Sequence, residues 1–362
     1  MVTGTANELP EQVMDSRGNL HQLQSHPLGQ GGQGVVFRTR DQHTAVKLIT
    51  DNIGQAVMDS GARQDLQRKL EDVQMLPLGD LHVAKPTATL DEPYVGYVMQ
   101  LLTGMTPMKK LIAVTAPNLA EFYLSGGGLR RRLRLLARTA GILARLHAVP
   151  LVYGDISDNN VFVSEDPDAM EVWLIDADNL HYVSQPGPTV YTPSFGAPEI
   201  VGGRSPNTLS DVFSFAVLAY GCLSQQHPFL GALVEEGDWA AVDDQDLESR
   251  AFRGEFPWIG DAEDDSNACD HGIPRSITLT PDLQALFQAT FGQGRTVPTA
   301  RPRMAKWVES LMRTTGPYGA VAANRPFTQI PASALGVTPP GRHSCTSKRG
   351  DGIRKWIWTL LT

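Results

Sequence analysis

The chain has few of the features that mark secreted, membrane-spanning or nucleic-acid-binding proteins. Its 362 residues include only three cysteines (Cys222, Cys269 and Cys345), which make no disulfide framework and fit a reducing compartment. The first twenty residues lack the apolar core of a secretory signal, and the longest apolar run, residues 212–223, is too short to span a bilayer. The formal net charge of -8 argues against the basic surface of a nucleic-acid-binding protein. We therefore expect a soluble, cytoplasmic protein without a nucleic-acid or membrane partner.

The densest group of reactive side chains lies between residues 153 and 178. Asp155 is followed after four residues by Asn160, and a later apolar run ends at Asp176. Transfer of a phosphoryl group from a nucleotide needs such groups, because the enzyme positions and neutralises the transition state rather than attacking it covalently. In this interpretation Asp155 accepts a proton from an acceptor hydroxyl. Asn160 and Asp176 hold the metal ions that bridge the phosphates.

A glycine-rich stretch lies near the start of the chain. Gly29, Gly31 and Gly34 fit the pattern G-x-G-x-x-G-x-V, and glycines let the backbone approach phosphates closely. The pattern alone is also typical of a glycine-rich hairpin. Here an apolar strand follows the glycines, where a dinucleotide-binding fold would begin a helix. A second strand, residues 44–49, contains Lys47 among apolar neighbours, where a lysine normally has a charged partner.

A carboxylate on the next helix is the expected partner of Lys47. Apolar residues recur at helical spacing over residues 66–73, and both Glu71 and Asp65 belong to this segment. We favour Glu71, and the alternative is that it is a solvated residue on a charged helix surface.

Several further segments have helical patterns. Residues 129–147 are predicted to be a helix, and we interpret its arginines between 130 and 134 as a solvated face. Residues 212–223 are apolar enough to predict a buried helix. Two shorter helices are expected at residues 283–291 and before Arg313. The tail is rich in proline and glycine, which predicts a linker with a docking segment or a disordered chain.

Taken in order, these motifs resemble those of bacterial eukaryotic-like protein kinases, the Hanks-type serine/threonine kinases. A-P-E at 197–199, D-V-x-S-F at 211–215 and Arg301-Pro302 complete the set. The resemblance covers residues 21–314 and implies an α+β, bilobal protein kinase fold. It implies a small lobe (21–102) with a five-stranded antiparallel sheet plus one helix, and a mostly helical large lobe (103–314). An N-terminal extension (1–20) and a C-terminal tail (315–362) remain.

The resemblance also implies ATP and Mg²⁺, with residues for each. Asp155, Lys47 and Glu71 are the implied catalytic residues, and Asn160 and Asp176 the implied metal ligands. In kinases, residues at the places of Glu199 and Arg301 form a buried ion pair, the aspartate at the place of Asp211 holds the catalytic loop, and a threonine at the place of Thr192 bonds the catalytic aspartate. The implied nucleotide-binding residues are Gly29, Gly31, Gly34, Val36, Ala45, Lys47, Met99, Gln100, Leu102 and Phe162.

Five positions depart from the kinase pattern. Tyr153 replaces the histidine of H-R-D, and Gly154 replaces the arginine that binds a phosphorylated activation segment. Ala177 and Asp178 replace the bulky residue and the glycine of D-F-G, and Ser157 replaces a lysine. None of these changes removes a metal ligand, so we expect an active serine/threonine kinase that acts on a protein substrate. The alternatives are a pseudokinase that serves as a nucleotide-gated binding module and, disfavoured by A-P-E, a small-molecule phosphotransferase.

Two short patterns suggest partners or a metal. Residues 256–260 (FPWIG) resemble a stretch of kinases encoded beside a phosphatase and a von Willebrand A protein, which makes these two proteins candidate partners. Cys269-x-His271 and His343-x-Cys345 together offer four possible zinc ligands, although two pairs this far apart in the chain are weak evidence.

Overall fold

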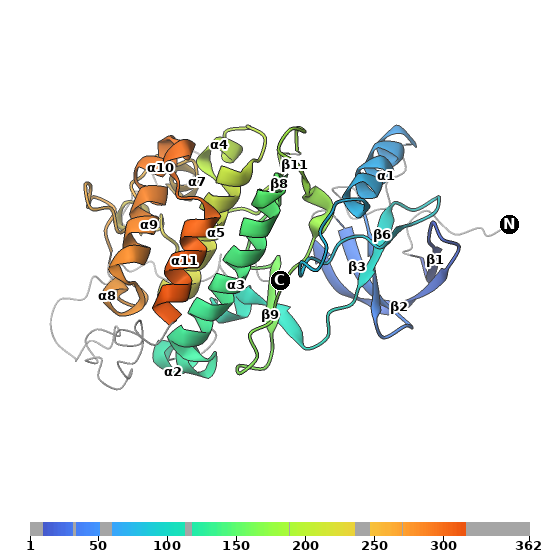
Figure 1. Cartoon of the computed structure of the whole chain (residues 1–362), viewed down its shortest axis with the longest axis horizontal. Helices are drawn as coiled ribbons and strands as arrows, with labels where there is room; N and C mark the ends of the chain where they lie inside the picture. Colours follow the sequence, from blue (N-terminus) through green and yellow to red (C-terminus); the bar gives the residue numbers. More distant parts are fainter. Residues whose placement is uncertain are drawn as a thin grey trace.

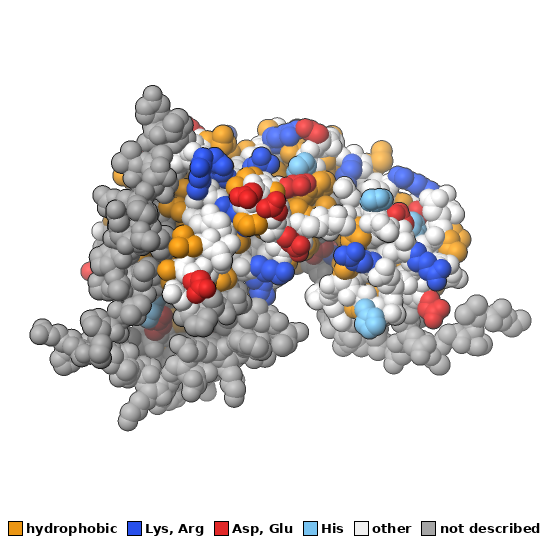
Figure 2. Space-filling model, turned by 90° about the horizontal axis from the view of Figure 1, so that it is seen from below, with side chains coloured by type: hydrophobic (Ala, Val, Ile, Leu, Met, Phe, Trp, Pro, Cys, Tyr) orange, Lys and Arg blue, Asp and Glu red, His pale blue; other side chains and the backbone are white. Residues whose placement is uncertain are grey.

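The chain forms two lobes. The computed structural model describes residues 10–31, 34–50, 60–112, 118–187, 189–235, 247–269 and 271–315, so nearly all of the expected tail lies outside the described residues. Figure 1 shows the strands β1–β6 and the helix α1 at one end of the molecule and the remaining helices at the other. Seen from below in Figure 2, the space-filling surface is hollowed between the two lobes. Residues 101–104 connect them. A bilobal α+β fold is therefore confirmed.

The small lobe is built on one antiparallel sheet with the order β1-β2-β3-β4-β6-β5. Side chains alternate between the faces of a strand, and here Val35, Phe37, Val46 and Val98 point into the core on one face. The opposite face carries the residues between them, which include Lys47. The strands are β1 (Gln12–Met14), β2 (Leu20–Gly31), β3 (Gly34–Thr39), β4 (Thr44–Leu48), β5 (Ala88–Thr89) and β6 (Gly96–Gln100).

Within the described residues this sheet has six strands, one more than the five expected. The added strand is β1, which pairs with β2 through Val13 and His21 and buries the Val13 side chain. Asp15 closes the turn between them by accepting hydrogen bonds from the N–H groups of Arg17 and Asn19. A three-residue strand with a single buried side chain carries no readable periodicity. The sheet therefore begins inside the segment expected to be an extension.

Helix α1 (Ser60–Gln74) contacts the same sheet on the face that carries Lys47. Leu70 is buried beside Tyr97 and Val95, and Leu66 packs against this group. These apolar residues fix which side of the helix faces inward, since burial of apolar surface is the main source of helix stability in a folded chain.

The large lobe packs its helices around one extensive apolar core. The long helix α3 (Gly128–Ala148) and the buried helix α5 (Thr208–Ser224) lie at its centre, and α9 (Pro281–Phe291) and α11 (Met304–Thr315) cover them. The four expected helices are thus confirmed. The shorter helices among the described residues are the 3-10 helices η1 (Met108–Leu111), η2 (Ala177–Asn179) and η3 (Pro298–Ala300) and the α-helices α2 (Leu119–Ser125), α4 (Pro198–Val201), α6 (Ala232–Glu235), α7 (Leu247–Phe252), α8 (Arg275–Thr278) and α10 (Gln293–Thr296).

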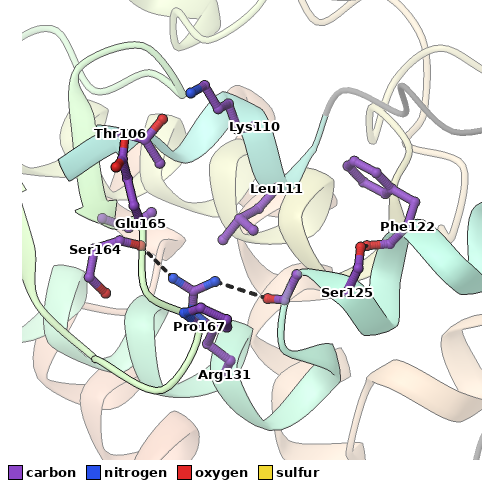
Figure 3. A pocket seen from close by; sticks show the side chains of 11 residues that line it. Thr106, Lys110, Leu111, Phe122, Ser125, Arg131, Ser164, Glu165 and Pro167 are labelled. Carbon is purple, nitrogen blue, oxygen red and sulfur yellow. Dashed lines mark hydrogen bonds between the residues drawn. The ribbon is translucent and has the colours of Figure 1, made fainter. Parts of the chain in front are cut away.

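The arginines of α3 are not a uniformly solvated face, contrary to expectation. Arg131 and Arg132 are 4% and 0% exposed. Arg131 donates to the carbonyl of Ser164, as Figure 3 shows, and to the carbonyl of Gly126. Arg132 donates to the carbonyl of Tyr123. Carbonyl groups at a helix end need donors when they are buried. The two guanidinium groups therefore fasten the end of α2 and the strand β9 to α3.

Short strands frame the loop that bears the predicted catalytic residues. β8 (Leu151–Val152) pairs with β11 (His181–Tyr182), and β9 (Val161–Ser164) lies between β7 (Met105–Pro107) and β10 (Val172–Leu174). The segments between β8 and β9 and between β10 and β11 therefore start and end at fixed points. This brings residues 153–160 and 175–180 together.

Candidate active site

The loop from β8 to β9 is held by Asp211 at the start of α5. Asp211 Oδ2 accepts from the N–H of Tyr153 at 2.8 Å, and Oδ1 accepts from the N–H of Gly154 at 2.9 Å. His147 lies 3.1 Å from the same carboxylate. Asp211 is buried, so these bonds are protected from water. The expected tie between Asp211 and the loop is confirmed.

The carboxylate of Asp155 is held on both oxygens. Oδ1 accepts from the backbone N–H and from the hydroxyl of Thr192, each at 2.8 Å, and Oδ2 accepts from Asn160 Nδ2 at 2.9 Å. Asp155 is 8% exposed. Burial raises the pKa of Asp155, while the hydrogen bonds from Thr192 and Asn160 oppose the shift. The result is a fixed carboxylate with a strengthened affinity for a proton.

Lys47 contacts two carboxylates from the other lobe. Its Nζ donates to Asp176 Oδ1 and, at 2.8 Å, to Asp178 Oδ2. Burial alone lowers the pKa of Lys47, but the charges of Asp178 and Asp176 outweigh it and raise the pKa. Burial and the neighbouring Asp178 raise the pKa of Asp176, against the opposing effect of Lys47. The lysine is therefore charged, and it joins the small lobe to the segment after β10.

The expected pair of Lys47 with Glu71 is not formed. Glu71 is exposed and accepts a hydrogen bond from Gln67 at 3.3 Å. Each residue of a helix turns by about 100°, which places Glu71 about 140° from the inward-facing Leu66 and Lys69 only about 60° from it. Lys69 accordingly points inward, and its Nζ donates to Asn179 Oδ1 at 3.0 Å. The alternative considered, Asp65, is also exposed and pairs with Arg68.

Four of the predicted nucleotide-binding residues fall on one face of the small-lobe sheet. Val36 is opposite Lys47 in the β3–β4 register, and Ala45 is opposite Met99 in the β4–β6 register. Because residues two apart on a strand share a face, these four side chains lie on the side away from the small-lobe core. Of the rest, Gln100 is exposed, Leu102 is partly buried, and Phe162 lies on β9 and is partly buried.

The glycine-rich stretch is a β-hairpin whose tip lies outside the described residues. Gly31 and Gly34 pair at the ends of β2 and β3. A β-carbon on Gly34, whose φ is +152°, would lie 2.2 Å from the carbonyl oxygen of Leu48, so only glycine fits there. At Gly29 and Gly31 a β-carbon would meet no atom of the described residues within 4 Å. The backbone of this hairpin is therefore open on that side, as close approach of a phosphate requires.

The proposed metal ligands fit a hard cation such as Mg²⁺. Asn160 Nδ2 donates to both the carbonyl and the carboxylate of Asp155, so the amide presents its oxygen as the remaining ligand atom. Asp176 supplies a carboxylate from a left-handed backbone conformation (φ +61°), which is uncommon outside glycine and concentrates at functional sites. Oxygen ligands of these two types are those that Mg²⁺ prefers.

Two of the departures from the kinase pattern have a structural explanation. Tyr153 is fully buried, and its hydroxyl donates to the carbonyl of Ile175, next to Asp176. Ala177 is also fully buried, in the large-lobe core. The tyrosine thus holds the segment that bears Asp176, the proposed metal ligand, where Ala177 offers only a methyl group.

The buried ion pair between Glu199 and Arg301 is confirmed. Arg301 Nη1 lies 2.6 Å from Glu199 Oε1, and Nη2 lies 2.7 Å from Oε2, a bidentate contact. Arg301 also donates to the carbonyls of Gly294 and Leu209. The pair links the start of α4 to the segment before α11, and so fixes the segment that bears Thr192 at its far end.

A cavity of about 340 Å³ lies elsewhere in the large lobe, between β7, η1, α2 and β9. Figure 3 shows Arg131 between its walls. None of the predicted site residues lines it, and its buried guanidinium already donates to backbone carbonyls. The zinc hypothesis gains no support. His343 and Cys345 lie outside the described residues, and Cys269 and His271 contact Gln226 and Glu235 respectively.

A sheet lobe and a helical lobe that bring together a lysine, two proposed metal ligands and a fixed aspartate define the kinase class of protein. The model of the protein kinase domain family matches residues 23–268. The chain therefore belongs to the protein kinase domain family.

Three curated relatives illustrate the range of similarity. The chain is 26% identical over 219 residues to serine/threonine-protein kinase PkaA of Streptomyces coelicolor, and 35% identical over 222 residues to serine/threonine-protein kinase pkn2 of Myxococcus xanthus. These matches cover 58% and 57% of this chain but only 40% and 25% of the relatives. Serine/threonine-protein kinase PknL of Mycobacterium tuberculosis is 24% identical over 374 residues, 98% of this chain and 90% of PknL.

Within the part of the chain that the structure describes, no helix combines the length and the apolar character needed to cross a bilayer.

Proposed function

We propose that this protein is a serine/threonine protein kinase that transfers the γ-phosphate of ATP to a protein hydroxyl. The observation that carries the proposal is the fixation of Asp155 by Thr192 on one oxygen and by Asn160 on the other. A carboxylate held in this way has one orientation, and burial raises its pKa. Both properties suit a general base for an acceptor hydroxyl.

Each residue of the site has a separate task in this proposal. Asp155 orients the acceptor hydroxyl and takes its proton as the hydroxyl oxygen bonds to the γ-phosphorus, the bond from that phosphorus to the β–γ bridging oxygen breaks, and ADP leaves. Lys47 binds the nucleotide phosphates from the small-lobe sheet. Asn160 and Asp176 hold Mg²⁺, which neutralises the charge on the phosphates when it is bound. Val36, Ala45, Met99 and Phe162 supply the apolar surfaces around the base of the nucleotide.

A polypeptide acceptor is favoured over a small molecule by the segment after Asp178. Thr192 lies on this segment and binds the proposed base directly, and the Glu199–Arg301 pair anchors the segment to the large lobe. A segment that is fixed at both ends provides a backbone on which a peptide can lie beside the base. A small acceptor needs no such support.

The proposal is tested by phosphate transfer from γ-labelled ATP and Mg²⁺. The purified chain is offered protein acceptors in one set of reactions and aminoglycosides and choline in another, with Asp176→Ala as the inactive control. Label in protein that disappears in the variant supports the proposal. Label only in a small acceptor would establish a small-molecule phosphotransferase. Nucleotide binding without transfer to any acceptor would establish a pseudokinase.

Two finer assignments belong to the same proposal. We place the protein in the cytoplasm, where ATP is available. We also propose a cognate phosphatase and a von Willebrand A protein as partners, on the resemblance of residues 256–260. Trp258 and Ile259 of this stretch are buried in the large-lobe core, so the partners must bind elsewhere on the surface. Affinity capture of the full chain with each purified candidate tests the partnership.

A further inference from the structure

The ammonium group of Lys47 contacts two carboxylates, those of Asp176 and Asp178, and their roles differ. Asp176 is a proposed metal ligand, so during turnover its oxygens would bind the metal ion as well as Lys47. Asp178 has no such competing role, and its Oδ2 lies 2.8 Å from Lys47 Nζ. Both side chains are 4% exposed, which makes this a contact between two buried charges. Loss of one partner in such a pair leaves the other charge buried without compensation, which is costly.

Helix α1 brings a positive charge to the same place. Lys69 is partly buried and donates to Asn179, the residue after Asp178. Burial lowers the pKa of Lys69, while the negative charges of Asp178 and Asp176 oppose that shift and the charge of Lys47 adds to it. Two carboxylates and one ammonium leave a net negative charge. A third carboxylate from α1 would add repulsion, whereas Lys69 balances the group.

The second oxygen of Asp178 supports this distribution of charge. Among the described residues, Asp178 Oδ1 is buried without a hydrogen-bond partner. An unsatisfied carboxylate oxygen is costly away from water unless positive charge lies nearby. Lys47 and Lys69 provide that charge, one from the sheet and one from the helix.

We propose that Asp178 is the positioning residue for Lys47, and that Lys69 is the counter-charge that α1 supplies to Asp178. In protein kinases the lysine is normally paired with a glutamate on this helix. Here the carboxylate that pairs with Lys47 comes from the segment after β10, and helix α1 contributes a positive charge instead of a negative one. The proposal rests on the proposed kinase function and specifies how its nucleotide-binding lysine is oriented.

The proposal is tested with Asp178→Asn, which keeps the size of the side chain and removes its charge. Asp72→Asn, an exposed carboxylate on α1, is the matched control. We expect Asp178→Asn to lose at least ten-fold in kcat/KM for ATP, about 1.4 kcal/mol, with an unchanged KM for the protein acceptor. Glu71→Gln and the control should stay within two-fold of the unaltered chain. If Asp178 had only a structural role, its replacement would also change the KM for the protein acceptor.

A charge relocation provides the second test. Lys69→Glu alone should reduce kcat/KM for ATP further than Asp178→Asn does, because it gathers three carboxylates around one ammonium. The double variant Asp178→Asn with Lys69→Glu returns the carboxylate to the helix and should recover at least three-fold over Lys69→Glu alone. A loss in Glu71→Gln as large as that in Asp178→Asn, or additive losses in the double variant, would overturn the proposal.

The affinity for MgATP, measured by titration calorimetry on the same variants, separates this inference from the function on which it rests. If the unaltered chain transfers no phosphate, the proposed function fails. The affinities for MgATP still test the positioning role of Asp178 in that case. Weaker binding in Asp178→Asn, but not in Glu71→Gln, supports the positioning role. Equal affinities in both variants and the unaltered chain contradict it.

Discussion

Thr192 gives Asp155 two hydrogen bonds, one from its backbone N–H and one from its hydroxyl, and both are 2.8 Å long. The side-chain bond closes the space beside the proposed base, which favours the short side chains of serine and threonine as acceptors. We therefore expect phosphoserine and phosphothreonine in labelled protein, and little phosphotyrosine.

The hydroxyl of Thr192 is tested by Thr192→Val, which keeps the shape and the backbone bond. A hydrogen bond to a charged group contributes about 1.5–3 kcal/mol, so kcat should fall by at least about ten-fold while KM for ATP stays the same. Thr192→Ser keeps the hydroxyl and should retain most of the activity. Predominant phosphotyrosine, or full activity in Thr192→Val, would show that Thr192 does not shape the acceptor site.

The ion pair of Glu199 and Arg301 is predicted to be essential for stability. The side chain of Arg301 is fully buried and that of Glu199 is 8% exposed, so Arg301→Ala leaves a carboxylate without its partner. We expect a loss of about 3–5 kcal/mol in the free energy of unfolding. The control is Lys306→Ala, which removes a surface pair with Glu309 and should cost about 0–1 kcal/mol. Urea denaturation of both variants makes the comparison, and equal midpoints would refute the expectation.

His227 is predicted to make the stability depend on pH in mildly acidic solution. Burial lowers the pKa of His227 to about 4, against the opposing effect of its hydrogen bond to the carbonyl of Ser194. The unfolded chain therefore binds the proton first as the pH falls. The stabilisation is complete above the ordinary pKa of about 6.5 and is lost between about 6.5 and about 4, by at most about 1.4 kcal/mol per pH unit.

The test for His227 is the change in melting temperature between pH 7 and pH 4.5. His227→Gln removes the titrating ring and should flatten this change, whereas His271→Asn, at an exposed position, should leave it as it is. An unaltered pH dependence in His227→Gln would assign the acid sensitivity to other groups.

Phosphorylation of the segment after β11 is not expected to be the main activating event. In kinases that use it, the new phosphate pairs with the arginine before the catalytic aspartate. Gly154 stands in that place with φ +87°, a conformation that a side chain would strain. Ser184 and Thr189 are exposed. The activity of phosphatase-treated protein and of Ser184→Ala/Thr189→Ala should stay within ten-fold of the untreated protein. A larger loss would show that another basic residue binds a phosphate there.

The features that depend on residues close together in the sequence could be predicted from it. The spacing of Asp155, Asn160 and Asp176 fixes their places at the ends of short strands, and the structure brings Asp155 and Asn160 into contact. The apolar runs predicted the helices α3, α5, α9 and α11, because a buried helix needs a continuous apolar surface.

Charge pairing could not be predicted in the same way. Glu71 and Lys69 differ by two positions on one helix, and only the packing of Leu66 and Leu70 against the sheet decides which of them faces Lys47. Asp178 stands in the usual place of a glycine, and that substitution was the available signal for its role. Arg131 and Arg132 appeared solvated because their partners are backbone carbonyls, which no side-chain pattern reveals.

The central claim is that Asp155 serves as the base in phosphate transfer to protein. The most direct measurement compares the unaltered chain with Asp155→Asn in transfer of γ-labelled phosphate to a protein acceptor, with ATP affinity determined in parallel. A general base contributes about 10²–10⁴-fold, so the variant should lose at least about a hundred-fold in rate while its affinity for ATP stays within two-fold. Transfer by Asp155→Asn at the unaltered rate, or a loss confined to ATP affinity, would contradict the account.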